Sequence, residues 1–271
     1  AAISLVSLAA LMLPPVRGVI IYEYGLAGTP IPWGITIDKA GSIWFTEQGS
    51  NRIAKLGAEY QIPTPGSVPW GITASKDEED IWFTEERPAA EGVIGRFVPS
   101  ENKFYEYYLP TSPAGSPRPR GITMNITKIS STNKMPRYDV WFTEFGRNRI
   151  GHLYGQDATN ARFSFYTIPG VTDAQPMSIS MSPIDYSIWF TEYRTNRISS
   201  IKLLEDGSAQ FRHYATGADS GLWGIGVDPN GFVWVAESKR NCIGRLNPVS
   251  GEYVTFTIPT PYSEPHELVI E

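Results

Sequence analysis

The sequence predicts an all-β fold, a β-propeller of six four-stranded antiparallel blades. The first observation is a motif, Ile-Trp-Phe-Thr-Glu, whose copies place their tryptophans 38 to 59 residues apart. Self-similarity at this period is typical of arrays of small sheets. The second observation is composition: the 271 residues include 25 Gly and 22 Pro, and 13% are aromatic, as expected of many short strands joined by tight turns. The copies of the motif are Ile43–Glu47, Ile81–Glu85, Val140–Glu144, Ile188–Glu192 and Val233–Glu237.

Each repeat contains four β-rich segments in a fixed order, which we name the inner, second, third and outer strands of a blade. The inner strand begins with a Pro-x-Gly-Ile sequence or a looser copy of it, and the second strand carries the Trp-Phe-Thr-Glu motif. A turn sequence such as Asp38–Gly41 separates these two strands. The outer strand ends near an Ile-Pro pair in most copies. The inner strands begin at Pro32, Pro69, Pro119, Pro176, Leu222 and Pro265.

The number of these segments predicts how the ring closes. Five complete blades start at the inner strands between Trp33 and Val227. A sixth inner strand is expected at His266–Glu271, and one further outer strand at Val19–Tyr24. We expect these two strands to pair and form a sixth blade, with Ala1–Leu13 left to supply a missing strand. That blade is either thin or completed by a neighbouring molecule through strand addition.

We divide the chain into an apolar N-terminal arm, residues 1–17, and a single propeller domain, residues 18–271. Ala1–Leu13 has no charged residue and is shorter than the about 20 apolar residues that a membrane-spanning helix needs. Its Ala, Leu and Met content suits a helix as well as a strand. We expect it to be an assembly element or a remnant that resembles a secretory signal. The side chains expected to mediate assembly are Ile3, Leu5, Val6, Leu8, Leu11 and Leu13.

Composition excludes several classes of function. The net charge is −5 and the chain has no basic block, which argues against a nucleic-acid partner. The single cysteine, Cys242, excludes an internal disulfide and argues against a cysteine-built metal site. No Ser-His-Asp order, phosphate-binding glycine loop or zinc-ligand spacing is visible. A glycosylation sequon at Asn125–Thr127 is in line with an extracellular or cell-surface location.

The glutamate that ends the motif is expected to serve the fold. Four of the five copies carry an asparagine four residues after this glutamate, which predicts a tight loop into the third strand with the asparagine in a left-handed backbone conformation. A catalytic acid or metal ligand is needed once, whereas this pair recurs in blade after blade. The pairs are Glu47 and Asn51, Glu144 and Asn148, Glu192 and Asn196, and Glu237 and Asn241.

Function is expected where the repeats differ, at the residue that follows the first residue of each inner strand. We call these the opening residues, and we expect them to lie near one mouth of the central channel. Most are aromatic, so they could bind a flat or apolar ligand, with Arg120 and His266 as polar anchors. Alternatively, they simply pack together and fill the channel. The opening residues are Trp33, Trp70, Arg120, Met177, Trp223 and His266.

The Pro-x-Gly-Ile sequences, the Trp-Phe-Thr-Glu strands and the Asn-x-Ile-Gly-Arg returns resemble the streptogramin lyase (virginiamycin B lyase) family of β-propellers. The resemblance implies a seven-bladed ring and the opening of a cyclic depsipeptide antibiotic by elimination. It also implies a histidine base, a magnesium ion and acidic side chains, with histidines in Pro-His-Gly sequences at the mouth. In this chain only Pro265-His266 matches that sequence, and Glu267 replaces the glycine. If the chain is a lyase, His266 and Glu267 are its expected catalytic residues.

The missing mouth histidines and the apolar arm lead to three functional hypotheses. The main one is a non-catalytic scaffold, extracellular or at the cell surface, that assembles into an oligomer or filament through its N-terminal arm and needs no cofactor. The alternative is a metal-dependent carbon–oxygen lyase that acts on a cyclic depsipeptide or lactone and uses magnesium. The third is a module that binds a peptide or glycan at the opening residues without turnover.

Overall fold

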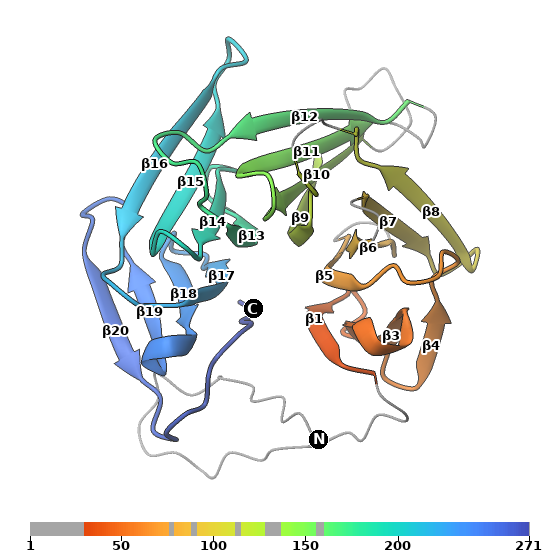
Figure 1. Ribbon diagram of the computed structural model, residues 1–271, viewed down its shortest axis with the longest axis horizontal. Coiled ribbons are helices and arrows are strands. Elements are labelled where there is room, and N and C mark those ends of the chain that lie inside the picture. Colours follow the sequence, from red (N-terminus) through yellow and green to blue (C-terminus); the bar gives the residue numbers. More distant parts are fainter. Residues whose placement is uncertain are drawn as a thin grey trace.

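The computed structural model describes residues 30–75, 79–87, 91–111, 115–127, 137–155 and 160–270. In these residues twenty strands form five four-stranded antiparallel sheets. The sheets are arranged as blades around a common axis, with the first strand of each blade nearest the centre and the fourth at the periphery (Figure 1). The predicted propeller of four-stranded antiparallel blades is therefore confirmed.

The five blades follow the chain without a crossover, because each strand pairs with the next along the sequence. Blade 1 contains β1 (Pro32–Ile37), β2 (Ile43–Glu47), β3 (Arg52–Lys55) and β4 (Ala58–Gln61). Blade 2 contains β5 (Pro69–Ala74), β6 (Ile81–Glu86), β7 (Gly92–Val98) and β8 (Lys103–Tyr108). Blade 3 contains β9 (Pro119–Thr127), β10 (Arg137–Glu144), β11 (Arg149–Gly155) and β12 (Arg162–Thr167). Blade 4 contains β13 (Pro176–Met181), β14 (Ile188–Glu192), β15 (Arg197–Leu203) and β16 (Ala209–Ala215), and blade 5 contains β17 (Leu222–Val227), β18 (Val233–Glu237), β19 (Cys242–Leu246) and β20 (Tyr253–Thr257).

The loop between the second and third strands has the predicted geometry. Asn148 has a φ of 52°, in the left-handed region, and its side chain holds the loop that leads to blade 4. Its amide nitrogen donates to the carbonyls of Ile168 and Val171 at 3.3 and 2.8 Å, and its side-chain oxygen accepts the N–H of Ala174 at 2.7 Å. Asn51, Asn196 and Asn241 also have positive φ values, between 51° and 57°. In two blades this loop includes a 3₁₀ turn, η1 (Gln48–Ser50) or η2 (Ser238–Arg240). The asparagine is thus a folding signal, as predicted.

The core lies between neighbouring blades. One hydrophobic cluster joins Trp82 and Ile94 of blade 2 to Ile122 and Phe142 of blade 3, and equivalent clusters join the other neighbouring pairs. The alternation of β-strand side chains places Trp and Thr of each motif on one face and Phe and Glu on the other. Blades 2, 3 and 4 have a neighbouring blade packed on both faces, which explains why the motif is buried throughout in them.

A threonine hydroxyl links each of the first four blades to the next. The hydroxyl of Thr46 accepts the N–H of Gly34 in its own blade at 2.9 Å and donates to the carbonyl of Trp70 in blade 2 at 2.7 Å. This arrangement is repeated, so the threonine of the motif connects consecutive inner strands. Thr84 joins Gly71 to Arg120, Thr143 joins Gly121 to Met177, and Thr191 joins Ser178 to Trp223.

The prediction of six blades is wrong, because the described residues form five. After β20 the chain runs to the centre of the ring, between blades 5 and 1 (Figure 1). There the N–H of Gly224 donates to the carbonyl of His266 at 2.6 Å. Residues 264–270 form no strand, because this segment lies against β17 at the position of an inner strand but lacks a ladder partner among the described residues on its other side. The outer strand expected at Val19–Tyr24 lies outside the described residues.

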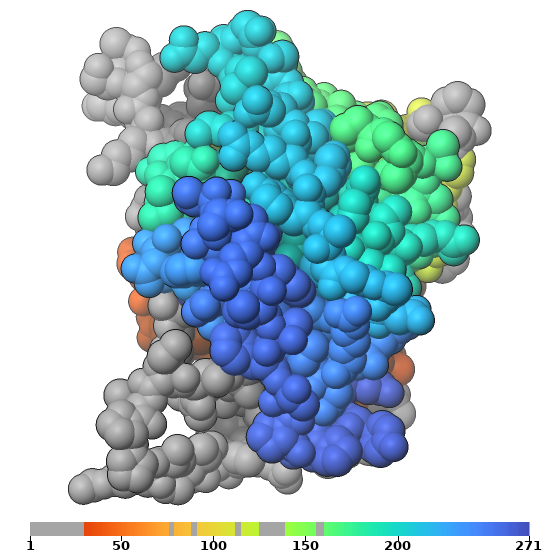
Figure 2. All heavy atoms as spheres, turned by 90° about the vertical axis from the view of Figure 1, so that its left-hand side faces the viewer, coloured from red at the N-terminus to blue at the C-terminus, as the bar shows by residue number. Residues whose placement is uncertain are grey.

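The outer surface of blades 4 and 5 is a continuous wall, built largely from the chain between β15 and β20 (Figure 2). Within the part of the chain that the structure describes, no helix is long and apolar enough to cross a membrane. The predicted arm at residues 1–17, with its six assembly side chains, lies outside the described residues.

Candidate functional site

The inner strands bring most of the opening residues into direct contact at one mouth of the ring. The rings of Trp33 and Trp70 meet edge to face with centroids 4.5 Å apart, and Trp33 lies 5.4 Å from Trp223. His266 stacks on Trp223 at 4.3 Å and lies 5.6 Å from Trp33. Trp33 of blade 1 therefore meets blade 5 and the C-terminal segment across the place where the ring closes.

A strained turn precedes each inner strand and sets the direction of its opening residue. The residue before the proline has a positive φ, 45° at Ile31 and 46° at Val68, although both side chains are β-branched. Such conformations cost about 1–3 kcal/mol each and persist only where the surrounding fold imposes them. Glu264, before Pro265, has a φ of 43°. The C-terminal segment thus repeats the turn of the blades and places His266 in the sixth opening position.

Arg120 and His266 occupy the third and the sixth of the six opening positions, so they lie on opposite sides of the mouth. Its side chain is only 6% exposed, and its guanidinium carbon lies 3.2 Å from the ring centroid of Trp70. One guanidinium nitrogen pairs with Glu86 at 2.8 Å, and Arg118 pairs with the same carboxylate at 2.6 Å. Desolvation lowers the pKa of Arg120 to about 10, partly offset by the charge of Glu86. The mouth therefore contains a buried cation.

His266 and Glu267 both have pKa values displaced toward the neutral form. Desolvation lowers the pKa of His266, opposed by the charge of Glu264, so the imidazole is mainly neutral at neutral pH. Desolvation raises the pKa of Glu267 to about 7. Both residues are exposed to solvent, on the segment that runs to the centre of the ring. A neutral imidazole in this position can accept a proton.

Met177, the remaining opening residue, is buried and packs into the wall of the mouth. The other two histidines lie in the blades. His152 stacks on Trp141 with ring centroids 4.1 Å apart and pairs with Asp139. His213 bonds to the hydroxyl of Ser199 at 2.8 Å. His152 lies in the third strand β11 and His213 in the outer strand β16, so neither stands at an opening position.

Sequence reasoning missed a second set of mouth residues, at the position directly after the motif glutamate. Glu86 pairs with the opening residue Arg120, and Tyr193 lies 5.9 Å from the opening residue Trp223. The ring centroid of Phe145 lies 5.1 Å from the guanidinium carbon of Arg120. The signal was present, because this position differs in every copy of an otherwise constant motif. The five residues are Gln48, Glu86, Phe145, Tyr193 and Ser238.

In the part of the chain that the structure describes, the mouth presents no complete set of protein ligands for the magnesium ion that the family resemblance implies. Mg²⁺ is bound mainly through carboxylate and other oxygen ligands, and Glu86 is already shared by two guanidinium groups. Among the described residues, no three His, Cys, Asp or Glu side chains gather closely enough to hold a metal ion, so Glu267 has no such group around it.

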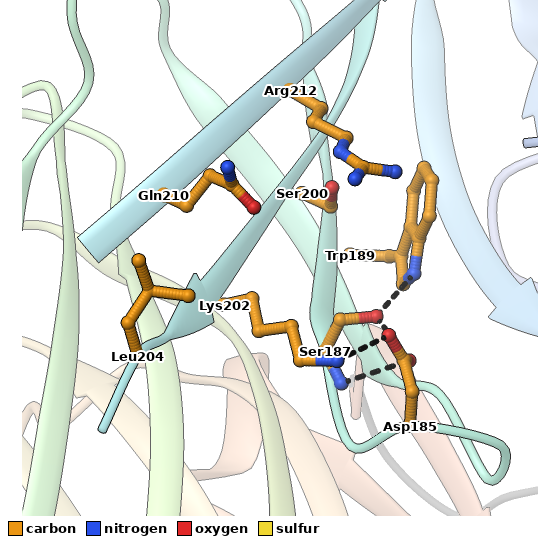
Figure 3. A pocket seen from close by; sticks show the side chains of 8 residues that line it. All are labelled: Asp185, Ser187, Trp189, Ser200, Lys202, Leu204, Gln210 and Arg212. Atoms are coloured by element: carbon orange, nitrogen blue, oxygen red, sulfur yellow. Dashed lines mark hydrogen bonds and ion pairs between the residues drawn. The ribbon is translucent and has the colours of Figure 1, made fainter. Parts of the chain in front are cut away.

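A surface groove on blade 4 lies far from the mouth. It includes Asp185 and Ser187, in the turn after β13, whereas the opening residue Met177 stands at the start of that strand. Burial raises the pKa of Asp185, but hydrogen bonds from Ser187 and Lys202 outweigh it, so the pKa falls to about 2. Figure 3 shows that Ser187 and Lys202 point toward Asp185, and both bond to its carboxylate. The groove contains no predicted site residue. Its lining is Asp185, Ser187, Trp189, Ser200, Lys202, Leu204, Gln210 and Arg212.

Comparison with known proteins identifies relatives of the whole ring. The sequence profile of the virginiamycin B lyase family matches residues 131–271. The chain is similar to selenomethionine-substituted virginiamycin B lyase from Staphylococcus aureus, with 31% identity, a TM-score of 0.72, and coverage of 90% of this chain and 76% of that one. A catalytically inactive histidine-to-alanine variant of the Staphylococcus aureus enzyme, with quinupristin, gives 31% identity and a TM-score of 0.73, covering 92% of this chain and 78% of that one. A streptogramin B lyase gives 30% identity and a TM-score of 0.72, covering 90% and 75%. No curated protein matches.

These relatives overturn the hypothesis of a non-catalytic, self-assembling scaffold, because the solved structures that share 30–31% identity with 90% of the chain are lyases. That hypothesis depended on the absence of Pro-His-Gly sequences from most inner strands. One histidine has nevertheless kept its place at the mouth, on the C-terminal segment. The resemblance inferred from the repeated motifs is confirmed, and the chain belongs to the virginiamycin B lyase family.

Proposed function

We propose that this protein is a carbon–oxygen lyase that opens a cyclic depsipeptide or lactone by elimination at the mouth of the propeller. The observation that carries the proposal is His266, held on Trp223 with its imidazole mainly neutral. It is the one histidine of the chain at an opening position, and membership of a lyase family makes the opening positions the natural site for a base.

The chemistry requires a base beside an acidic C–H. His266 accepts the proton from the carbon next to the substrate carbonyl, the C–H electron pair forms a carbon–carbon double bond, and the adjacent C–O bond of the ester breaks. The ester oxygen leaves as a carboxylate with the electron pair of that bond. No water or external reductant takes part. Such positioned proton transfer contributes about 10²–10⁴-fold to a rate.

The aromatic side chains of the mouth supply a binding surface for the rest of the substrate. Trp33, Trp70 and Trp223 remain partly exposed although they contact one another, so a ring or an apolar side chain can stack on them. Glu267, with a pKa of about 7, is partly protonated at neutral pH. The substrate class is a cyclic peptide ester with aromatic or apolar side chains.

The products distinguish elimination from hydrolysis and from binding alone. The purified protein is incubated with quinupristin, the compound present with the Staphylococcus aureus variant. Elimination yields a ring-opened isomer of unchanged mass with a new carbon–carbon double bond, visible by ultraviolet absorbance. Hydrolysis adds the mass of water. A protein that binds quinupristin without forming either product acts as a binding module, and the proposal is then wrong.

A further inference from the structure

Arg120, its neighbour Trp70 and the carboxylate of Glu86 form a small charged cluster on the side of the mouth opposite His266. Two guanidinium groups, of Arg118 and Arg120, share the one carboxylate of Glu86. Within the described residues, Glu86 is also the one acid whose charge acts on Arg120. The cluster therefore has one positive charge in excess, and the guanidinium of Arg120 is almost fully buried. A buried cation without full compensation is unfavourable and is characteristic of functional sites.

Two hydrogen-bond donors in this cluster are unused. Within the described part of the chain, Nε of Arg120 and Nε1 of Trp70 are buried and have no hydrogen-bond partner. Both belong to the same stacked pair, since the guanidinium carbon of Arg120 lies 3.2 Å from the ring centroid of Trp70. Leaving such donors unpaired costs about 1–3 kcal/mol for each group. Excess positive charge and two unpaired donors together match an anionic oxygen.

We infer that the Arg120–Trp70 pair receives the carboxylate that leaves the substrate during elimination. This inference rests on the proposed function and identifies a second half of the site. The proton moves to the imidazole of His266 and the electron pair of the broken C–O bond moves to the ester oxygen. Once the ring is open, the free end of the chain that carries the new carboxylate reaches the guanidinium on the far side of the mouth and binds there. Trp33 and Trp70 lie between the two groups.

The guanidinium of Arg120 offers the mouth a fixed positive charge for the carboxylate of the product. Planar guanidinium groups bind carboxylates with two parallel hydrogen bonds, and charge-assisted bonds of this kind are about twice as strong as neutral ones. Glu86 and Phe145 fix the guanidinium in place before the substrate arrives. A guanidinium fixed in advance loses little conformational freedom when the carboxylate of the product binds it.

The experiment compares two ring-opened products as inhibitors: linear quinupristin with its free carboxylate, and the same peptide with a carboxamide in that position. In the natural protein the acid should bind about ten- to a hundredfold more tightly than the amide. Arg120→Gln should abolish this difference, and Arg120→Lys should restore part of it. The matched control is Arg118→Gln, which also removes one positive charge that pairs with Glu86, but at a side chain that is 42% exposed. This variant should keep most of the preference for the acid over the amide.

The outcomes separate the inference from the function on which it rests. If the natural protein opens quinupristin and Arg120→Gln still prefers the acid, the inference is wrong and the lyase function stands. Equal loss in Arg118→Gln and Arg120→Gln would also overturn it, because net charge alone would then explain the preference. If the natural protein neither opens quinupristin nor binds its linear acid, the lyase proposal fails and the inference with it. Thermal melting of each variant shows that the comparison is made between folded proteins, and Arg120→Lys serves if Arg120→Gln is unfolded.

Discussion

The main-chain N–H of Gly224 donates directly to the carbonyl oxygen of His266 at 2.6 Å. At the four other interfaces a threonine hydroxyl stands between the corresponding groups, as Thr191 does between Ser178 and Trp223. Blade 5 has Ala236 where the others have threonine. A side chain at Gly224 would meet the carbonyl of His266 at 2.6 Å, so glycine is required there. With Ala236 in place of threonine, the N–H of Gly224 bonds directly to the carbonyl of the residue whose imidazole stacks on Trp223.

Ala236→Thr tests this seating. The added hydroxyl would compete with the carbonyl of His266 for the N–H of Gly224, as the other threonines bond to the corresponding N–H, and would displace the imidazole from its position on Trp223. We expect turnover of quinupristin to fall about tenfold or more, because small displacements of a base reduce proton transfer strongly. Unfolding by denaturant should change little. Ala236→Ser, which adds a smaller side chain, is the graded control. Unchanged turnover in Ala236→Thr would show that the seating of His266 does not depend on this contact.

The threonine connection itself should be measurable as stability. Thr143→Val removes a buried hydroxyl that accepts the N–H of Gly121 at 2.9 Å and donates to the carbonyl of Met177 at 3.0 Å. Because both backbone groups lose their partner, we expect the free energy of unfolding to fall by about 2–4 kcal/mol. Urea denaturation measures this, with Thr167→Val on the outer strand as a control that should change little. A loss equal to that of the control would contradict the role assigned to the hydroxyl.

Two substitutions at Asn148 distinguish the contribution of its left-handed backbone conformation from that of its side-chain hydrogen bonds. Asn148→Gly keeps a residue that tolerates a positive φ but removes three hydrogen bonds, whereas Asn148→Ala also introduces backbone strain. We expect both variants to lose about 1–3 kcal/mol of unfolding free energy, with the alanine variant the less stable of the two. Equal stability of Asn148→Gly and the natural protein would show that the side-chain bonds contribute nothing.

The raised pKa of Glu267, about 7, gives stability a defined pH dependence. The folded protein holds this proton more tightly than the unfolded chain, so this contribution to stability is fully present below the usual carboxyl pKa and is lost as pH rises through about 7. Glu267→Gln should therefore melt at a higher temperature than the natural protein at about pH 8 and at a similar temperature at about pH 4. His266 acts in the opposite direction at low pH, because its lowered pKa makes protonation unfavourable in the folded state. The same melting difference at both pH values would contradict the assignment to Glu267.

The fold was accessible from sequence because each blade repeats its own folding signals. The motif glutamate, the asparagine four residues later in four copies and the proline before five of the six opening residues are local, and the copies support one another. Ring closure is different. It depends on residues 264–270, which lie on β17 through one backbone hydrogen bond without forming a ladder, and the sequence of a strand does not reveal whether a partner is available.

Part of the site could be predicted because it follows the repeats of the blades. The opening residues are defined by register, so the repeats alone place Trp33, Arg120 and His266 at one mouth. The burial of Arg120 and its ion pair with Glu86 could not be predicted, because variation between the copies marks the position of Glu86 but not the side chain that it contacts. The absence of histidine from five of the six opening positions favoured the scaffold hypothesis, which is wrong. Elimination needs one base, so the position of a histidine matters more than the number of histidines.

The turnover of quinupristin by His266→Ala is the most direct test of the proposed lyase function. We predict that the natural protein forms the ring-opened isomer and that the rate falls about 10²–10⁴-fold in His266→Ala. His213→Gln, which alters a histidine on the outer strand β16, should keep the natural rate. Undiminished turnover in His266→Ala would contradict the assignment of His266 as the base.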